Sequence, residues 1–80
     1  MAIEYSKQAA KAISKISNPF KKNIKEAIEK LPVGDVKKLQ GHAMLYRLRV
    51  GDWRIVFSYQ GEDTILVESI GPRGQIYKGV

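Results

Sequence analysis

The stretch LYRLRVGDWRIVF, residues 45–57, alternates apolar and polar or charged side chains through most of its length, around a central Gly-Asp pair. Alternation with a period of two is typical of β-strands, and Gly-Asp between two such runs predicts a hairpin with a two-residue turn. A turn at Gly51-Asp52 fixes which residues face each other across the two strands. The predicted pairs are Val50 with Trp53, Arg49 with Arg54, Leu48 with Ile55, Arg47 with Val56, and Tyr46 with Phe57.

This pairing sorts the side chains of the hairpin onto two chemically different faces. The apolar face, which the rest of the domain has to cover, holds Tyr46, Leu48, Val50, Trp53, Ile55, Phe57 and Tyr59. Trp53 is therefore predicted to pack in the core and not to serve as a platform for stacking bases. The opposite face holds Arg47, Arg49 and Arg54.

Three arginines on one face of a sheet repel one another, by roughly 0.2–1 kcal/mol for two like charges directly across a strand pair. The sequence shows no obvious acid on the same face that would offset this repulsion. A guanidinium group presents a planar fork that binds phosphate or carboxylate through two hydrogen bonds. We therefore predict that this face binds a polyanion, with a merely solvated face as the alternative.

The residues before the hairpin predict a strand and two amphipathic helices. Residues 2–5 have the pattern of a strand, and Ser6 is a suitable N-cap for a following helix. Asn18-Pro19 predicts the start of a second helix, which ends before Pro32. Apolar residues recur at helical spacing in both segments: Ala9, Ala12, Ile13 and Ile16 in the first, and Phe20, Ile24, Ala27, Ile28 and Leu31 in the second.

Three strands are predicted over residues 45–50, 53–60 and 64–70, and residues 75–77 could add a short edge strand. The sequence gives no clear prediction for the connector at residues 33–42. The order of elements predicts a single domain over residues 1–80, of the α+β class. We expect an N-terminal strand, a two-helix hairpin and an antiparallel sheet of three to four strands.

Composition excludes several classes of protein. The 80 residues include no cysteine and one histidine, His42, so neither a disulfide framework nor a zinc site of the usual nitrogen and sulfur ligands is expected. No apolar stretch approaches the roughly 20 residues that span a bilayer, and the N-terminus lacks the apolar run of a signal peptide. We expect a soluble, cytoplasmic protein that needs no cofactor or metal.

The charge of the chain indicates an anionic partner. The net charge is +6 and the sequence pI is about 9.7, values that suit nucleic acid, an acidic protein or an anionic membrane surface. Nine of the ten lysines precede residue 40, whereas all four arginines follow it. Lysine on a helix surface is mostly solvated, so this distribution predicts that the binding residues lie in the second half of the chain.

Three further candidates lie outside the hairpin. Arg73 is predicted on a loop just past the third long strand, and Tyr77 follows four residues later. The Tyr77 phenol could stack on a base or exchange a proton with a ribose hydroxyl. His42 lies in the connector before the hairpin and is predicted to be a loop residue, with an RNA contact as the alternative.

The segment YRLRVGDWRIVF, followed by ILVESIGPRGQIYK, resembles the RelE/ParE toxin superfamily, and specifically the RelE-type ribosome-dependent mRNA interferases. The resemblance covers most of the chain. It rests on an ordered set of residues: two basic positions on one strand, an arginine after the turn, a late arginine and a tyrosine near the end. It implies the RelE-like fold, with a strand, two helices and an antiparallel sheet.

The resemblance also implies an activity and roles for single residues. Arg47 and Arg49 match the family's paired basic positions, which bind RNA phosphates, and relatives have lysine there. Arg54, Arg73 and Tyr77 match catalytic positions, although Arg73 and Tyr77 lie closer together than in some members. The implied reaction is metal-independent cleavage of mRNA in the ribosomal A site, in which a 2′-hydroxyl attacks the adjacent phosphate.

The implied partners are mRNA on the ribosome, ribosomal RNA and a cognate acidic antitoxin, with no membrane partner. Two alternatives stay open at this point. A ParE-type toxin would inhibit a DNA topoisomerase and cleave no RNA. A catalytically inactive module would bind RNA or an antitoxin without performing chemistry.

Overall fold

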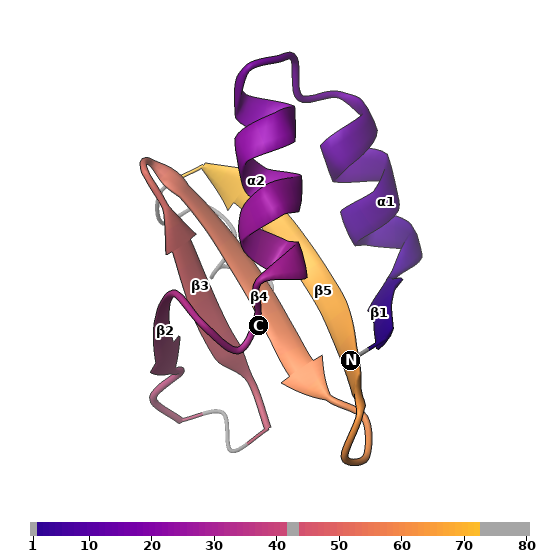
Figure 1. Cartoon of the computed structure of the whole chain (residues 1–80), viewed down its shortest axis with the longest axis vertical. Helices are drawn as coiled ribbons and strands as arrows, with labels where there is room; N and C mark the ends of the chain where they lie inside the picture. Colours follow the sequence, from indigo (N-terminus) through magenta and orange to yellow (C-terminus); the bar gives the residue numbers. More distant parts are fainter. Residues whose placement is uncertain (1, 42–43, 73–80) are drawn as a thin grey trace.

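The computed structural model describes residues 2–41 and 44–72 of the chain (Figure 1). These residues form two helices and five strands. In chain order the elements are β1 (Ala2–Tyr5), α1 (Lys7–Ser14), α2 (Phe20–Glu29), β2 (Asp35–Lys38), β3 (Tyr46–Val50), β4 (Trp53–Tyr59) and β5 (Thr64–Pro72).

The five strands form one sheet in the order β1-β5-β4-β3-β2. Strand β1 runs parallel to β5, and the other neighbouring strands are antiparallel. The predicted α+β class is confirmed, and the sheet is larger than expected and mixed in direction. The added strand, β2, comes from the connector at residues 33–42. No strand was predicted there, because Val36 is the one apolar residue of β2.

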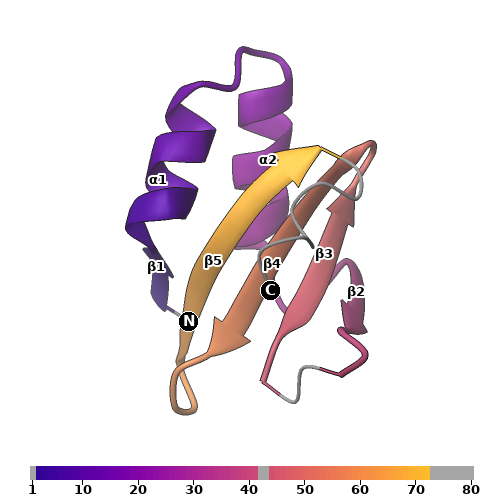
Figure 2. The ribbon, with the colours of Figure 1, turned by 180° about the vertical axis from the view of Figure 1, so that it is seen from behind.

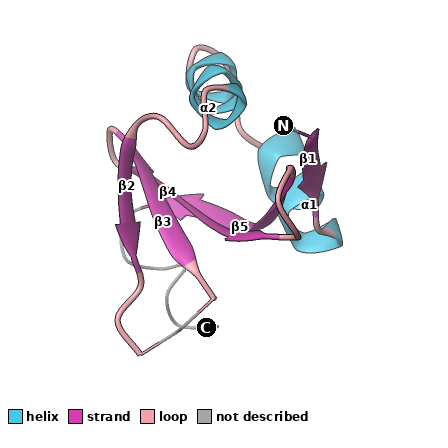
Figure 3. Ribbon diagram, turned by 60° about the horizontal axis from the view of Figure 1, so that its bottom comes forward, coloured by secondary structure: helices cyan, strands magenta, loops and turns pink. Residues whose placement is uncertain are grey.

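Both helices lie on one side of the sheet, with α1 against β5 and α2 against β3 (Figure 3). The first helix begins at its predicted cap, where the Ser6 hydroxyl accepts a hydrogen bond of 3.0 Å from the Ala9 backbone N–H. The same hydroxyl donates to the Glu68 carbonyl of β5 at 2.7 Å. Ser6 therefore both caps α1 and ties it to the sheet.

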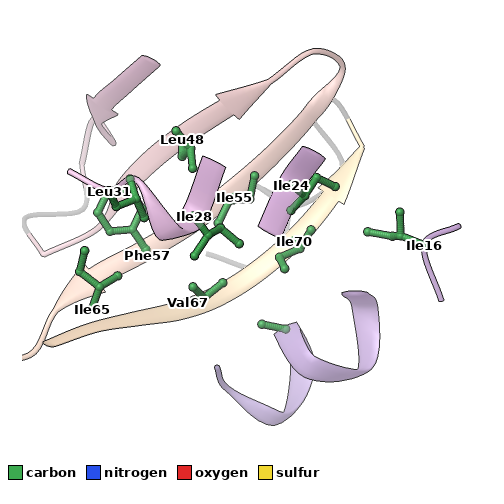
Figure 4. Packing of buried hydrophobic residues seen from close by; sticks show 11 residues of the cluster. Ile16, Ile24, Ile28, Leu31, Leu48, Ile55, Phe57, Ile65, Val67 and Ile70 are labelled. Atoms are coloured by element: carbon green, nitrogen blue, oxygen red, sulfur yellow. The ribbon is translucent and has the colours of Figure 1, made fainter. Parts of the chain in front are cut away.

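The core lies between α2 and the sheet, with further side chains from α1 and the segment that follows it (Figure 4). Ile24 and Ile28 are four residues apart and thus on the same side of α2, and both are fully buried. They meet Leu48, Ile55 and Phe57 of the hairpin. Burial of such a side chain contributes roughly 1.5–3 kcal/mol, so the apolar face of the hairpin is the main stabilising surface of the domain.

The start of the second helix differs from the prediction. Pro19, and not Asn18, occupies the N-cap position, and no side chain caps this end of the helix. Phe20, which was expected in the core, is 51% exposed and stands 6.2 Å from Trp53 between ring centroids. Phe20 has the helical spacing of the buried residues Ile24 and Ile28, but it is the first residue of α2 and more than half of it is exposed.

The predicted hairpin register is confirmed at all five pairs, from Val50 opposite Trp53 to Tyr46 opposite Phe57. Gly51 has φ of 58°, whereas Asp52 has no positive φ. This is the pattern of a type II′ turn, which takes glycine at its first central position and matches the twist of the flanking strands.

Strand β5 contains an irregularity opposite Val56 and Phe57, where the register of the β4–β5 pair shifts by one residue. Before the shift Ile65 and Val67 face the helices, and after it Ile70 does, so Glu68 is the extra residue of a β-bulge. Within the described ranges no helix is long and apolar enough to cross a membrane.

Replacement of Ser6 by alanine should lower the free energy of unfolding by about 1–2 kcal/mol, because it removes an N-cap and the hydrogen bond to Glu68. Urea unfolding followed by circular dichroism measures this loss. Ser14→Ala is the matched control, since the Ser14 hydroxyl contacts only the Lys11 carbonyl on the exposed side of α1. Equal losses in the two variants would contradict the role assigned to Ser6.

Replacement of Gly51 by alanine should cost about 1 kcal/mol, because an L-residue is strained at a φ of 58°. No neighbouring atom lies within 4 Å of the added methyl group, so the loss would report backbone strain and not a clash. Thermal and urea unfolding measure it, with Asp52→Ala in the same turn as control. A Gly51→Ala protein as stable as the wild type would exclude the type II′ assignment.

Candidate functional site

Arg47, Arg49 and Arg54 lie on the face of the sheet opposite to Leu48 and Ile55, which pack in the core under the helices. Figure 2 views the sheet from the side that faces away from α2. Residues paired across neighbouring strands lie on the same face of a sheet. One row across the sheet consists of Asp35, Arg49 and Arg54, and the next consists of Lys37, Arg47 and Val56. We call the surface formed by Lys37, Arg47, Arg49 and Arg54 the basic face.

Arg47 is largely enclosed, with a side chain only 12% exposed. Its guanidinium Nη2 lies 3.5 Å from Oδ1 of Asp35, a carboxylate that is 53% exposed. The expectation that this face holds no acid is therefore wrong. The sequence concealed this acid because it belongs to β2, a strand that the pattern of residues 33–42 did not predict.

Arg54 has its side chain fixed at the hairpin turn. Its Nη1 donates to the Gly51 carbonyl at 3.0 Å and to the Trp53 carbonyl at 3.2 Å. Arg49, directly opposite Arg54, has an exposed side chain. The three arginines thus differ in freedom: Arg54 is held by backbone carbonyls, Arg47 is enclosed beside an acid, and Arg49 is open to solvent.

A group of hydrogen-bonded polar side chains around the buried Ser58 adjoins the arginines on the same side of the sheet. The Ser58 hydroxyl, 3% exposed, donates to the Glu68 carboxylate at 3.0 Å and accepts from the Gln60 amide at 3.0 Å. Sequence reasoning missed this group. The signal was available, because Ser58 has the same alternation as Arg54 and Val56 along β4, and Glu68 has the same alternation as Leu66, the residue opposite Ser58 on β5.

Val56 is fully buried, although it faces away from the helices. It separates Arg47 from Ser69, which is 4% exposed. The centre of this side of the sheet is thus shielded from water, and charges at its border interact more strongly than in open solvent. The sequence placed Val56 opposite Arg47 correctly but gave no sign of its burial.

Two of the predicted catalytic residues, Arg73 and Tyr77, lie outside the described residues. His42 and the edge strand predicted over residues 75–77 lie outside them as well. Among the tyrosines inside them, Tyr5 packs on the helix side of the sheet. Burial raises the pKa of the Tyr5 phenol, and the Glu29 carboxylate raises it further. Tyr5 therefore stays protonated at neutral pH and is excluded as a general base.

The arrangement is suited to binding phosphate groups. Arginine stays protonated at all relevant pH values, and a guanidinium fork binds a phosphate through two hydrogen bonds. Among residues 2–41 and 44–72 there is no group of three or more His, Cys, Asp or Glu side chains that could hold a metal ion. The chemistry that this part of the chain supplies is positive charge fixed on a rigid sheet.

Comparison with known proteins places the chain in a family. Residues 3–77 match the model of the ParE toxin of type II toxin-antitoxin systems, parDE. Among curated proteins, the chain is 31% identical over 85 residues to Toxin RelE3 of Methanocaldococcus jannaschii, with 96% of each chain covered.

Solved structures agree with this assignment. The toxin of the RelB-RelE complex from Methanococcus jannaschii has a TM-score of 0.76 at 30% identity, over 95% of this chain and 96% of that chain. The archaeal RelE-RelB complex from Pyrococcus horikoshii OT3 has a TM-score of 0.70 at 30% identity, over 92% of this chain and 96% of that chain.

The RelBE toxin-antitoxin complex from E. coli has a TM-score of 0.71, over 92% of this chain and 98% of that chain. The sequence identity is only 17%, so this match shows a likeness of fold alone. The family match over residues 3–77, together with the archaeal relatives, extends over nearly the whole of the chain. This chain belongs to the ParE toxin family of type II toxin-antitoxin systems, within the RelE/ParE superfamily, and is a toxin of the RelE type.

Proposed function

We propose that the protein is a ribosome-dependent endoribonuclease that cleaves mRNA in the A site without a metal ion. The observation that supports this proposal best is the gathering of Arg47, Arg49 and Arg54 on the side of the sheet away from the helices. RelE-type relatives support the choice of a toxin that acts on RNA.

The proposed reaction is a transesterification. The 2′-oxygen of one nucleotide bonds to the adjacent phosphorus and loses its proton to a base, while the bond to the 5′-oxygen of the next nucleotide breaks and that oxygen gains a proton. Negative charge develops on the nonbridging oxygens and on the leaving oxygen. Fixed guanidinium groups stabilise this charge, and loss of one such donor typically costs about 10²–10³ in rate.

We assign a role to each predicted residue. Arg47 and Arg49 bind the RNA phosphates, and Arg54, held at the turn by two carbonyls, stabilises the transition state. Arg73 stabilises the phosphate or the leaving group, and Tyr77 transfers a proton or stacks on a base. A phenol has a pKa near 10, so a Tyr77 base at neutral pH needs a shift of about 3 units, worth roughly 4 kcal/mol.

This demand explains why the ribosome would be required. Neighbouring arginines lower a phenol's pKa, but only in part. We therefore infer that the free protein is a slow nuclease. A ribosome that holds the mRNA with its 2′-hydroxyl in line for attack can supply several kcal/mol through orientation alone.

A cognate antitoxin completes the proposal. The archaeal relatives were solved as RelB-RelE complexes of antitoxin and toxin. With a net charge of +6 and a basic face on this chain, an acidic antitoxin segment over that face would hold the toxin inactive by occupying its arginines.

The alternative activity, inhibition of a DNA topoisomerase, is favoured by one observation: the family model is that of ParE. The tyrosine near the end of the chain and the RelE3 relative argue for RNA cleavage instead. The two activities differ in target and are separated by experiment.

Purified protein should cleave mRNA on programmed ribosomes, and primer extension would map the new ends. We expect Arg54→Ala to slow cleavage about 10²- to 10³-fold, because a fixed cation is lost from the transition state, and expect slowing for Arg73→Ala and Tyr77→Phe as well. Lys22→Ala, an exposed residue of α2 on the other side of the sheet, is the control and should cleave normally. Circular dichroism has to show that each variant is folded.

The ribonuclease proposal would be overturned in favour of the ParE-type activity if the mRNA stayed intact and the protein inhibited DNA supercoiling by a topoisomerase. Tight binding of RNA or antitoxin, with neither cleavage nor topoisomerase inhibition, would favour the inactive module.

Binding to single-stranded RNA should weaken steeply with salt, because each phosphate that a cation neutralises adds about −0.7 to the slope of log K against log salt. The basic face offers four cations, so we expect a slope near −3. Arg49→Gln should make the slope shallower by about 0.7. Lys25→Gln on α2 should leave it unchanged, and a flat response of the wild type would count against the basic face as the binding surface.

A further inference from the structure

Asp35 is the acid that adjoins the basic face. The register of β2 and β3 places it directly opposite Arg49, and its carboxylate reaches diagonally to Arg47 at 3.5 Å. Lys37, two residues further along β2, lies opposite Arg47 on the same face. One carboxylate therefore stands among several cations of two neighbouring strands.

The contact between Asp35 and Arg47 has the character of a loose ion pair. The two atoms lie within salt-bridge distance but form no hydrogen bond in the structure, and the Asp35 side chain is 53% exposed. An ion pair that lacks hydrogen-bond geometry and has one partner largely in solvent contributes little to stability. A phosphate that binds the Arg47 guanidinium through two charge-assisted hydrogen bonds would replace the carboxylate readily.

We propose that Asp35 is an internal counter-ion of the basic face, which pairs with Arg47 in the free protein and gives up this pairing when an RNA phosphate binds. The proposal rests on the proposed function in so far as RNA is the anion. Asp35 is thus a positioning residue, which acts on RNA through Arg47.

This role has two consequences of opposite sign. In the free protein the carboxylate offsets the repulsion among Arg47, Arg49 and Lys37, so its removal should reduce stability. A phosphate that binds Arg47 has to displace the carboxylate from the guanidinium, so removal of the carboxylate should increase affinity for RNA. A residue that served only the fold would produce the first effect without the second.

The test measures the affinity of a fluorescent single-stranded RNA oligonucleotide by anisotropy at low salt, for wild type, Asp35→Asn and Asp63→Asn. Asp63→Asn changes the net charge equally, but Asp63 is exposed in the β4–β5 turn, at the opposite end of β4 from Gly51. We expect Asp35→Asn to bind about fivefold more tightly, from the Coulomb interaction at short range in a largely aqueous medium. We expect Asp63→Asn to stay within about 1.5-fold of wild type, because salt screens distant charges.

Thermal unfolding of the same proteins gives the second readout. Asp35→Asn should lower the Tm by about 1–4 °C, the range for loss of a weak ion pair in a domain of this size. Asp63→Asn should not lower it. This measurement also establishes that the Asp35 variant is folded when its affinity is compared.

A double substitution tests whether Asp35 acts through Arg47. In an Arg47→Gln background, Asp35→Asn should change RNA affinity by less than about 1.5-fold, because interacting residues are not additive. Equal gains for Asp35→Asn and Asp63→Asn would overturn the proposal. So would weaker binding by Asp35→Asn, a fivefold gain that persists without Arg47, or no RNA binding by wild type at low salt.

Failure of this inference is distinguishable from failure of the proposed function. The binding assay contains no ribosomes and does not depend on cleavage. If mRNA on ribosomes stays intact while the higher RNA affinity of Asp35→Asn depends on Arg47, the nuclease proposal fails and the counter-ion role of Asp35 is supported. If mRNA is cleaved on ribosomes while Asp35→Asn has the RNA affinity of the wild type, the nuclease proposal is supported and the counter-ion role of Asp35 fails.

Discussion

The structure depends on the pairing of β3 with β4 through the turn at Gly51-Asp52. Because side chains of a strand alternate between two faces, a shift of one residue in this register would exchange the faces. Leu48, Ile55 and Phe57 would then point to solvent, and the arginines would point into the core. The burial of these apolar residues under α2 makes that exchange prohibitively unfavourable, so the core fixes the position of the basic face.

The two faces of the sheet differ in composition: one stabilises the domain, and the other is the face that we propose for binding. The helix side is covered by α1 and α2, and its buried apolar side chains stabilise the domain. The other side has a shielded centre at Val56, Ser58 and Ser69, with the cations beside it. Rigid strands that are held from behind suit a surface that has to keep several like charges close together before an anion binds.

The cations are also held by unequal means, which bears on their proposed roles. Backbone carbonyls of the turn hold Arg54, an acid from the edge strand pairs with Arg47, and Arg49 remains open. A guanidinium that is fixed before substrate arrives stabilises developing charge without reorganisation, whereas a mobile one is better suited to capture a flexible strand. The sheet thus provides both kinds of cation within three residue pairs.

Sequence alone determined the α+β class, β1, both helices, the three long strands and the full register of the hairpin, because these features follow from local periodicity, the Ser6 cap and the turn. It therefore also brought Arg47, Arg49 and Arg54 to one face. Only the tertiary structure decided that β1 pairs in parallel with β5, that residues 35–38 form β2 and place Asp35 beside Arg47, and that a bulge in β5 shifts its register against β4. These contacts join residues far apart in sequence, and no local pattern encodes them, because strand pairing across a sheet is selected by the packing of the whole domain.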